Sequence, residues 1–245
     1  MKERETIIEV KDLVKKFNEF VANDHLTFNV YKGEIFGFLG ANGAGKTTAI
    51  RILCGLSKPT SGQITVAGFD AHRQTEDIKK SIGYMSQKFS LYEDLTVYEN
   101  IRFYGAIYGL SLAQLKAKTK ELLQRLGMEE IRNTLIRDIP TGWRQKLAFS
   151  IAIFHNPAIV FLDEPTGGVD PVTRRQFWKL IYEASHAGIT VFVTTHYMDE
   201  AEYCDRISIM SEGRIVALDT PDNLKRQYNS ANIDEVFLKI VRNVN

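Results

Sequence analysis

Gly40-Ala41-Asn42-Gly43-Ala44-Gly45-Lys46-Thr47 is the stretch around which this chain is organised. An apolar run at 35–39 precedes it, and the segment 49–53 that follows is predicted to be a helix. This order of strand, glycine-rich turn and helix is the context that a phosphate-binding loop requires. The glycines let successive backbone N–H groups converge on an anion, and the helix start adds partial positive charge. Lys46 can then reach the β- and γ-phosphates of a nucleotide, and the Thr47 hydroxyl can ligate Mg²⁺.

The composition indicates one large α/β domain with little net charge. The chain has 245 residues, 44% of them hydrophobic, and 31 Lys and Arg against 30 Asp and Glu. Because this balance leaves no excess of positive charge to attract the phosphates of a nucleic acid, we expect no nucleic-acid partner. No apolar stretch approaches the ~20 residues that cross a bilayer. The charged start at 1–5 lacks the apolar segment of a signal peptide, so we expect none.

Strand and helix patterns alternate in the first and last thirds of the chain. Strands are predicted at 6–14, 28–31, 35–39, 64–66, 82–85, 158–162 and 189–193, with a hairpin at 207–218. Helices are predicted near 77–80, after Asp170-Pro171, and at 221–228 and 233–241. From 96 to 153 apolar residues recur at helical spacing. We interpret 88–155 as a helical subdomain inserted into the α/β core; the alternative for its apolar stripe is a partner surface.

Three polar positions follow predicted strands: Gln87, Asp163-Glu164 and His196. In open α/β sheets ligands gather outside the carboxyl ends of the strands. An aspartate at such an end suits Mg²⁺, and the adjacent Glu164 can orient or deprotonate the water that attacks a γ-phosphate. His196 is a candidate γ-phosphate contact. Phe17, shortly before the loop, could stack on adenine or belong to the core.

Together these residues resemble the ATP-binding subunit of ABC transporters over essentially the full length of the chain. The matching motifs are the P-loop (40–47), the Q-loop (Gln87), Walker B with the catalytic glutamate (159–164), the D-loop (167–170) and the H-loop (His196). The resemblance implies a single domain over 1–245 with a P-loop NTPase core, in which helices flank a mixed sheet. It also implies an antiparallel β subdomain beside the inserted helical one.

The resemblance implies ATP and Mg²⁺ as cofactors and assigns the site residue by residue. Catalytic roles fall to Lys46, Gln87, Glu164 and His196, and Mg²⁺ ligation to Thr47, Gln87 and Asp163. The nucleotide would contact Phe17, where the family has an aromatic residue that stacks on adenine, and Gly40, Ala41, Asn42, Gly43, Ala44, Gly45, Lys46, Thr47 and Thr48. Two such domains would sandwich two ATP molecules, so a second ATP-binding domain is expected, as an identical copy or a paralogue.

The signature motif is where this sequence departs from the family. In place of Leu-Ser-Gly-Gly-Gln it has Ile139-Pro140-Thr141-Gly142-Trp143. Pro140 has neither hydroxyl nor N–H for a phosphate, and the Trp143 indole can only donate. We expect the Thr141 hydroxyl and the Gly142 N–H to contact the opposing γ-phosphate instead. The alternative is a half-site that does not catalyse.

The variant motif resembles that of the ATPases of bacterial drug and antibiotic exporters. In these exporters, separate membrane subunits carry six helices each. This predicts an ATPase on the cytoplasmic face of the inner membrane, bound peripherally to integral membrane permease subunits. Phe89, Leu91 and Tyr92, just after Gln87, would lie near the groove that receives a membrane subunit; the alternative is that they pack within the helical subdomain. One alternative is an ABC importer, although the chain ends at Asn245, too soon for a regulatory domain of the sugar-importer type. The other is a non-transport ABC ATPase, against which near-neutral charge and a single set of motifs argue.

Overall fold

The computed structural model describes residues 4–87 and 91–244, with side chains described as far as residue 240. Its larger sheet has six strands in the order β10-β9-β3-β8-β7-β6. These strands are β10 (Arg214–Asp219), β9 (Arg206–Ser211), β3 (Ile35–Gly40), β8 (Thr190–Thr195), β7 (Ile159–Asp163) and β6 (Ile82–Met85). All neighbours pair in parallel except β10, which is antiparallel to β9, so the sheet is mixed. Every residue of β3, β7 and β8 is buried, as expected where both faces of a sheet are covered.

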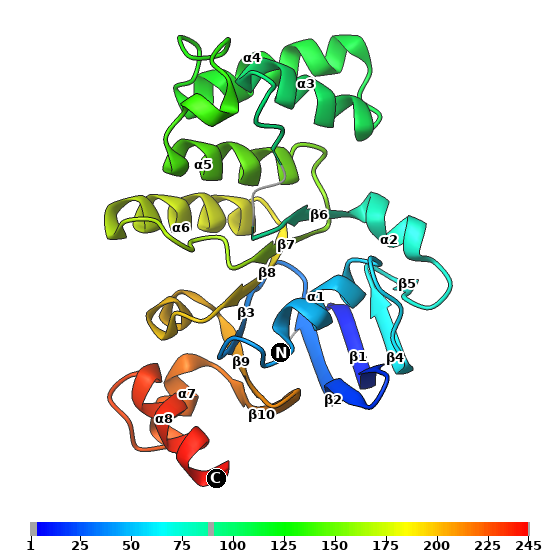
Figure 1. Ribbon diagram of the computed structural model, residues 1–245, viewed down its shortest axis with the longest axis vertical. Helices are drawn as coiled ribbons and strands as arrows, with labels where there is room; N and C mark the ends of the chain where they lie inside the picture. The colour runs from blue at the N-terminus through cyan, green and yellow to red at the C-terminus, as the bar shows by residue number, and fades with distance from the viewer. Residues whose placement is uncertain (1–3, 88–90, 245) are drawn as a thin grey trace.

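The smaller sheet is antiparallel and has the order β2-β1-β4-β5. Its strands are β1 (Thr6–Phe17), β2 (Phe20–Tyr31), β4 (Ser61–Val66) and β5 (Phe69–Asp70), followed by helix α2 (Thr75–Ser81). Helix α1 (Lys46–Leu53) lies between the two sheets (Figure 1). One continuous apolar core joins them, with Leu26 of β2, Phe38 of β3 and Ile50 of α1 among its members. The phosphate loop that precedes α1 is therefore held from both sides.

The other face of the larger sheet is covered by helices of the second half of the chain. These are α5 (Thr141–Ala152), α6 (Pro171–His186), η2 (Met198–Tyr203), α7 (Pro221–Gln227) and α8 (Ile233–Val244). Phe149 of α5 and Phe177 of α6 meet edge to face there, with ring centroids 5.3 Å apart. Asp170 caps α6 by accepting from the N–H groups of Val172 and Thr173, which confirms the predicted helix start.

Helices α3 (Val97–Ile107) and α4 (Leu112–Leu126) and the short η1 (Ile136–Asp138) stand with α5 at one end of the molecule (Figure 1). Both α3 and α4 begin with complete capping boxes, Thr96 with Glu99 and Ser111 with Gln114. These elements enclose a core of their own, which includes Ile101, Leu122 and Leu147. That residues 88–155 work as a subdomain stays a prediction, and its first residues, 88–90, lie outside the described part of the chain.

The predicted fold class is confirmed, while several strands are longer than the sequence suggested. The strand predicted at 28–31 begins at Phe20, and the one predicted at 6–14 reaches Phe17, so these two residues pair across a hairpin. The pairing of β1 with β2 contains register shifts, which disturb the alternation by which a strand is recognised. Two-residue β5 escaped prediction altogether.

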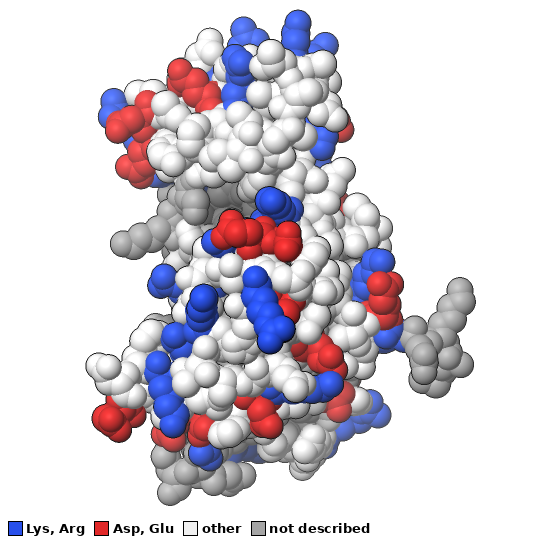
Figure 2. Space-filling view, turned by 90° about the vertical axis from the view of Figure 1, so that its right-hand side faces the viewer, with Lys and Arg blue, Asp and Glu red and all other residues white. Residues whose placement is uncertain are grey.

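Among the helices that the structure describes, none has the length and hydropathy of a membrane-spanning segment. Figure 2 shows Lys and Arg interspersed with Asp and Glu over the face it presents.

Candidate active site

The polar residues predicted at strand ends meet at one edge of the larger sheet. Strand β7 pairs Asp163 with Thr194 of β8, and β3 pairs Leu39 with Thr195. Because these strands are parallel and β6 lies on the other side of β7, their carboxyl ends share an edge. The loops that leave this edge carry the predicted catalytic groups.

The phosphate loop has the geometry of an anion cradle. Gly43 and Gly45 take left-handed φ angles of +83° and +99°. A Cβ at Gly45 would lie 2.3 Å from the carbonyl oxygen of Ala22, so only glycine fits there. Helix α1 starts without a side-chain cap and without an acidic residue in its first turn. Its first N–H groups therefore remain available for a phosphate, which fits the triphosphate of ATP.

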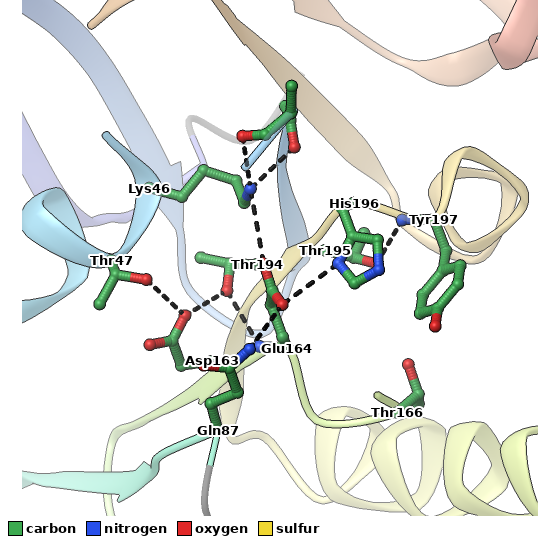
Figure 3. A network of polar contacts seen from close by, with 12 residues as sticks. Lys46, Thr47, Gln87, Asp163, Glu164, Thr166, Thr194, Thr195, His196 and Tyr197 are labelled. Carbon is green, nitrogen blue, oxygen red and sulfur yellow. Dashed lines mark hydrogen bonds and ion pairs between the residues drawn. The ribbon is translucent and has the colours of Figure 1, made fainter. Parts of the chain in front are cut away.

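Lys46 is held over this loop. Its Nζ donates to the carbonyl oxygens of Gly40 (2.7 Å) and Ala41 (3.0 Å) and lies 3.5 Å from Glu164 Oε1 (Figure 3). Only 4% of the side chain is exposed. Burial lowers the pKa of Lys46, and the Glu164 carboxylate opposes that effect. The ammonium group is thus directed at the space that the loop encloses.

Glu164 is the centre on which three side chains from other elements converge (Figure 3). Gln87 Nε2 donates to its Oε2 at 3.0 Å, His196 Nδ1 lies 3.2 Å from the same oxygen, and Lys46 faces Oε1. Its backbone takes an unusual φ of +48°. Its N–H donates to both the carbonyl and the hydroxyl oxygen of Thr194, each at 3.1 Å. These contacts therefore fix the position of the Glu164 carboxylate.

Asp163 lies beside the first turn of α1. The Thr47 hydroxyl donates to its Oδ1 at 3.3 Å, and the Thr194 hydroxyl donates to the same oxygen at 2.7 Å. Burial raises the pKa of Asp163, while the Thr194 hydrogen bond favours the charged form. A hydroxyl and a carboxylate are the hard oxygen donors that Mg²⁺ prefers, so this donor set fits the ion.

A pocket of about 440 Å³ lies between the phosphate loop, Gln87 and Glu164. It is lined by Phe20, Ala22, Asn42, Gly43, Gly45, Lys46, Thr47, Thr48, Gln87 and Glu164. The predicted loop residue Ala44 is not among them; it is buried and donates its N–H to the carbonyl oxygen of Ala41. Phe17 is exposed but is not among these lining residues; its aromatic neighbour across the hairpin, Phe20, is. Stacking of adenine on Phe17 stays a prediction.

The signature segment lies apart from this pocket, at the start of α5. Pro140 is the residue before the helix, and Thr141 is exposed in its first turn. A Cβ at Gly142 would lie 2.7 Å from Thr173 Cγ2 of α6, so this glycine also lets the two helix starts pack closely. Trp143 is partly exposed beside it. The structure therefore does not bring Thr141 and Gly142 together with the nucleotide groups of the same chain.

Sequence reasoning missed several residues that support the site. Thr194 is wholly buried; its hydroxyl donates to Asp163 and accepts from the Glu164 N–H. Gln145, also buried, donates to the carbonyl oxygen of Pro165, directly after Glu164. Thr166 donates to the buried Glu200, whose pKa is raised by burial. The roles of these residues depend on neighbours in space that are far away in the sequence, so no sequence pattern predicted them.

The chain is similar to curated bacterial proteins. The sequence model of the ABC transporter family matches residues 23–167. The probable multidrug ABC transporter ATP-binding protein YbhF of Escherichia coli (strain K12) is 46% identical over 97% of this chain, which spans 42% of that protein. The linearmycin resistance ATP-binding protein LnrL of Bacillus subtilis (strain 168) is 33% identical over 97% of this chain and 79% of its own length.

Solved structures are similar over nearly the whole fold. One is an ATP-binding subunit of an ABC transporter, with a TM-score of 0.86 and 30% sequence identity. The superposition covers 96% of this chain and 100% of the solved one. The ATP-binding cassette MJ0796, a dimer in a post-hydrolysis state bound to ADP and Pi, gives 0.78 at 25% identity. That comparison covers 87% of this chain and 98% of the cassette.

Proposed function

The chain is an ATP-binding, ATP-hydrolysing member of the ABC transporter family, and from that premise we propose that it drives an exporter through separate membrane subunits. The sequence prediction of the family is confirmed. The printed names of the relatives, multidrug transport and linearmycin resistance, support an exporter of drug-like compounds. The convergence of Lys46, Gln87 and His196 on Glu164 is the observation that carries the catalytic part of the proposal.

Each side chain in this cluster has a proposed task in hydrolysis. Lys46 and the loop N–H groups bind the β- and γ-phosphates, which places the γ-phosphate against Glu164. Glu164 accepts the proton of the attacking water, and His196 and Gln87 hold its carboxylate and the γ-phosphate in line. Thr47 and Asp163, with Gln87, would hold Mg²⁺, which neutralises charge on the phosphate oxygens.

A second ATP-binding domain completes the proposed assembly. The start of α5 has no side-chain cap, and Thr141 is exposed there. An N-terminus of this kind can accept an anion from outside the chain. We propose that Thr141 and Gly142 contact the γ-phosphate held by the partner domain, and that residues 88–155 turn as a unit when the domains close.

The proposed membrane partner docks on the exposed face of α3. Phe103 and Ile107 lie one turn apart on this face, and the Tyr92 ring meets Phe103 edge to face at 4.8 Å. Half of the Tyr92 side chain and 61% of Ile107 are exposed, which is costly unless a partner covers them. Leu91 is half-buried in the adjoining cores, and Phe89 lies outside the described residues. Attachment here would hold the protein peripherally at the cytoplasmic face of the inner membrane.

The test is a tagged pull-down from detergent-solubilised membranes of the native cell, with mass spectrometry of the co-purifying proteins. We expect one or two six-helix membrane proteins in stoichiometric yield with the parent chain. The variant Phe103→Asp should lose them, while Leu56→Asp, a charge on an exposed leucine next to α1, should retain them. Ribosomal or DNA-repair partners without a membrane protein would overturn the transport proposal and leave the ATPase standing.

A further inference from the structure

Glu200 is a carboxylate that the protein encloses entirely. It lies in the short helix η2, and none of its side chain is exposed. The hydroxyl of Thr166, itself only 1% exposed, donates to its Oε1, and Arg174 Nε of α6 lies 3.6 Å from the same oxygen. Glu200 is not among the residues that line the phosphate pocket. Its contacts are therefore with the chain itself and not with a nucleotide.

The contact with Thr166 leads directly to Glu164. Thr166 follows Glu164 by two residues on the loop that leaves β7 (Figure 3). The N–H of Gly167 donates to the Glu164 carbonyl oxygen at 3.2 Å, which closes a tight turn around Thr166. Glu164 takes a left-handed φ of +48° in this turn, a conformation that persists in a non-glycine residue only when its surroundings impose it. The hydrogen bond from Thr166 to Glu200 is one of the constraints that impose it.

The backbone of Glu200 is joined to the loop that carries His196. Its N–H donates to the carbonyl oxygen of Tyr197, the residue directly after His196, at 3.2 Å. The guanidinium of Arg174 covers the Tyr197 ring at 4.3 Å from its centroid and donates to Asp199 at 3.1 Å. These contacts hold η2 against α6. Glu200 therefore links the loop that follows β7 to the loop that follows β8.

A buried carboxylate is an expensive way to join two loops if packing alone is needed. Burial raises the pKa of Glu200, whereas the hydrogen bonds from Thr166 and Thr195 and the charge of Arg174 favour its ionised form. Apolar residues of similar volume often replace a buried ion pair without loss of stability. What they cannot supply is a directed hydrogen bond, which fixes the position of the Thr166 hydroxyl and of the turn that carries it.

We propose that Glu200 is a positioning residue for ATP hydrolysis. Through Thr166 it holds the Glu164 loop at the place where the Glu164 carboxylate meets His196, at 3.2 Å. The inference rests on the proposed function, in which Glu164 accepts the proton of the attacking water. Because Glu200 lies outside the pocket, its loss should slow the chemical step and leave ATP binding unchanged.

The experiment measures kcat, ATP affinity and Tm of the assembled complex in matched variants. Thr166→Val keeps the shape of threonine and removes the hydroxyl that Glu200 binds, and Glu200→Gln keeps the size of the side chain and removes its charge. We expect kcat to fall about tenfold in each, less than the ~100-fold cost of a misplacement by roughly 1 Å, with the Kd for ATP unchanged. Thr166→Ser should restore the parental rate. Asp199→Asn, which removes only the exposed partner of Arg174, is the control and should turn over normally.

The variant Thr166→Val is then repeated in the Glu164→Gln background, with phosphate release followed in a single turnover. If Glu200 acts through Glu164, no further decrease is expected there, because residues that act as a unit are not additive. A decrease of the same size in both backgrounds would overturn the inference, as would parental kcat in Thr166→Val, an equal decrease in Asp199→Asn, or a loss of ATP affinity as large as the loss of rate. A parent complex without turnover would contradict the proposed function and the inference together.

Discussion

The side-chain amide of Gln87 lies 3.0 Å from the Glu164 carboxylate, although 77 positions separate the two residues in the chain. Gln87 follows β6 and precedes the helices α3 and α4, whereas Glu164 follows β7, the strand that pairs with β6. His196 reaches the same carboxylate oxygen from the end of β8. A displacement of the chain at Gln87 would therefore change the hydrogen bonding of the proposed general base.

The variant Glu164→Gln should bind ATP and hydrolyse it at least 100-fold more slowly, because a positioned base contributes about 10² to 10⁴ in rate. The amide keeps the size of the side chain but cannot accept the proton of water. Closed dimers should accumulate with ATP, as measured by size-exclusion chromatography alongside phosphate release. Glu183→Gln, an exposed glutamate on α6, is the matched control and should turn over normally. Normal turnover in Glu164→Gln would remove this residue from the mechanism.

The variant Lys46→Ala should lose ATP affinity, because the charge facing the β- and γ-phosphates disappears. A hydrogen bond to a charged group contributes about 1.5–3 kcal/mol, so Kd should rise roughly 10- to 100-fold. Equilibrium binding of a fluorescent ATP analogue measures this change. The exposed Lys120→Ala controls for the loss of one positive charge. Parental affinity in Lys46→Ala would count against the whole phosphate site.

The variant Thr141→Val should lower ATP hydrolysis in the assembled complex about tenfold, since it removes one hydroxyl from a charged acceptor. Valine keeps the shape of threonine, and Thr141→Ser, which keeps the hydroxyl, should hydrolyse ATP like the parent. The readout is steady-state phosphate release with both membrane and ATP-binding subunits present. If Thr141→Val and the parent had the same rate, the substitute role of this hydroxyl would be wrong.

The variant Gly142→Ala should be destabilised by about 1 kcal/mol, because its Cβ would press on Thr173 Cγ2. Thr173→Ser removes that methyl group and keeps the hydroxyl that donates to Asp170. The double variant should therefore recover the loss and gain the better helix propensity of alanine. Urea unfolding of the four proteins forms a double-mutant cycle. A coupling energy near zero would show that the two helix starts do not press on each other.

Stability should fall in mildly acidic solution through His155. Its ring stacks on Tyr108 with centroids 3.9 Å apart, and its Nε2 lies 3.1 Å from the Ile82 carbonyl oxygen. Burial lowers the pKa of His155 from 6.5, so the folded chain binds fewer protons there than the unfolded one. The contribution of His155 to the free energy of unfolding is therefore fully present above pH 6.5. It is lost as the pH falls below 6.5 through the lowered pKa of the folded chain.

The comparison is between the parent and His155→Phe, which keeps a ring on Tyr108 and cannot be protonated. Thermal unfolding at about pH 7.5 and about pH 5.5 should show a smaller decrease of Tm in the variant, because it lacks the titrating group. Equal decreases would mean that other groups account for the acid sensitivity.

Local sequence patterns were enough to predict most of the strands and helices. The wholly buried runs of β3, β7 and β8 and the capped helix at Asp170 follow from apolar runs and from turn and cap residues that act over a few positions. The start of β2 at Phe20 was missed because register shifts break its alternation. That error hid the aromatic residue that lines the pocket at the phosphate loop, Phe20.

The sequence by itself determined the phosphate loop, because its anion cradle is built by consecutive backbone groups whose geometry depends on Gly43, Gly45 and the helix that follows. It also determined the family, through the order of motifs. The tertiary structure decided which groups meet. Gln87 and His196 contact the carboxylate of Glu164, whose N–H donates to Thr194. Phe20 rather than Phe17 lines the pocket. The register of neighbouring parallel strands sets these contacts, and register is a property of the packed sheet rather than of any segment.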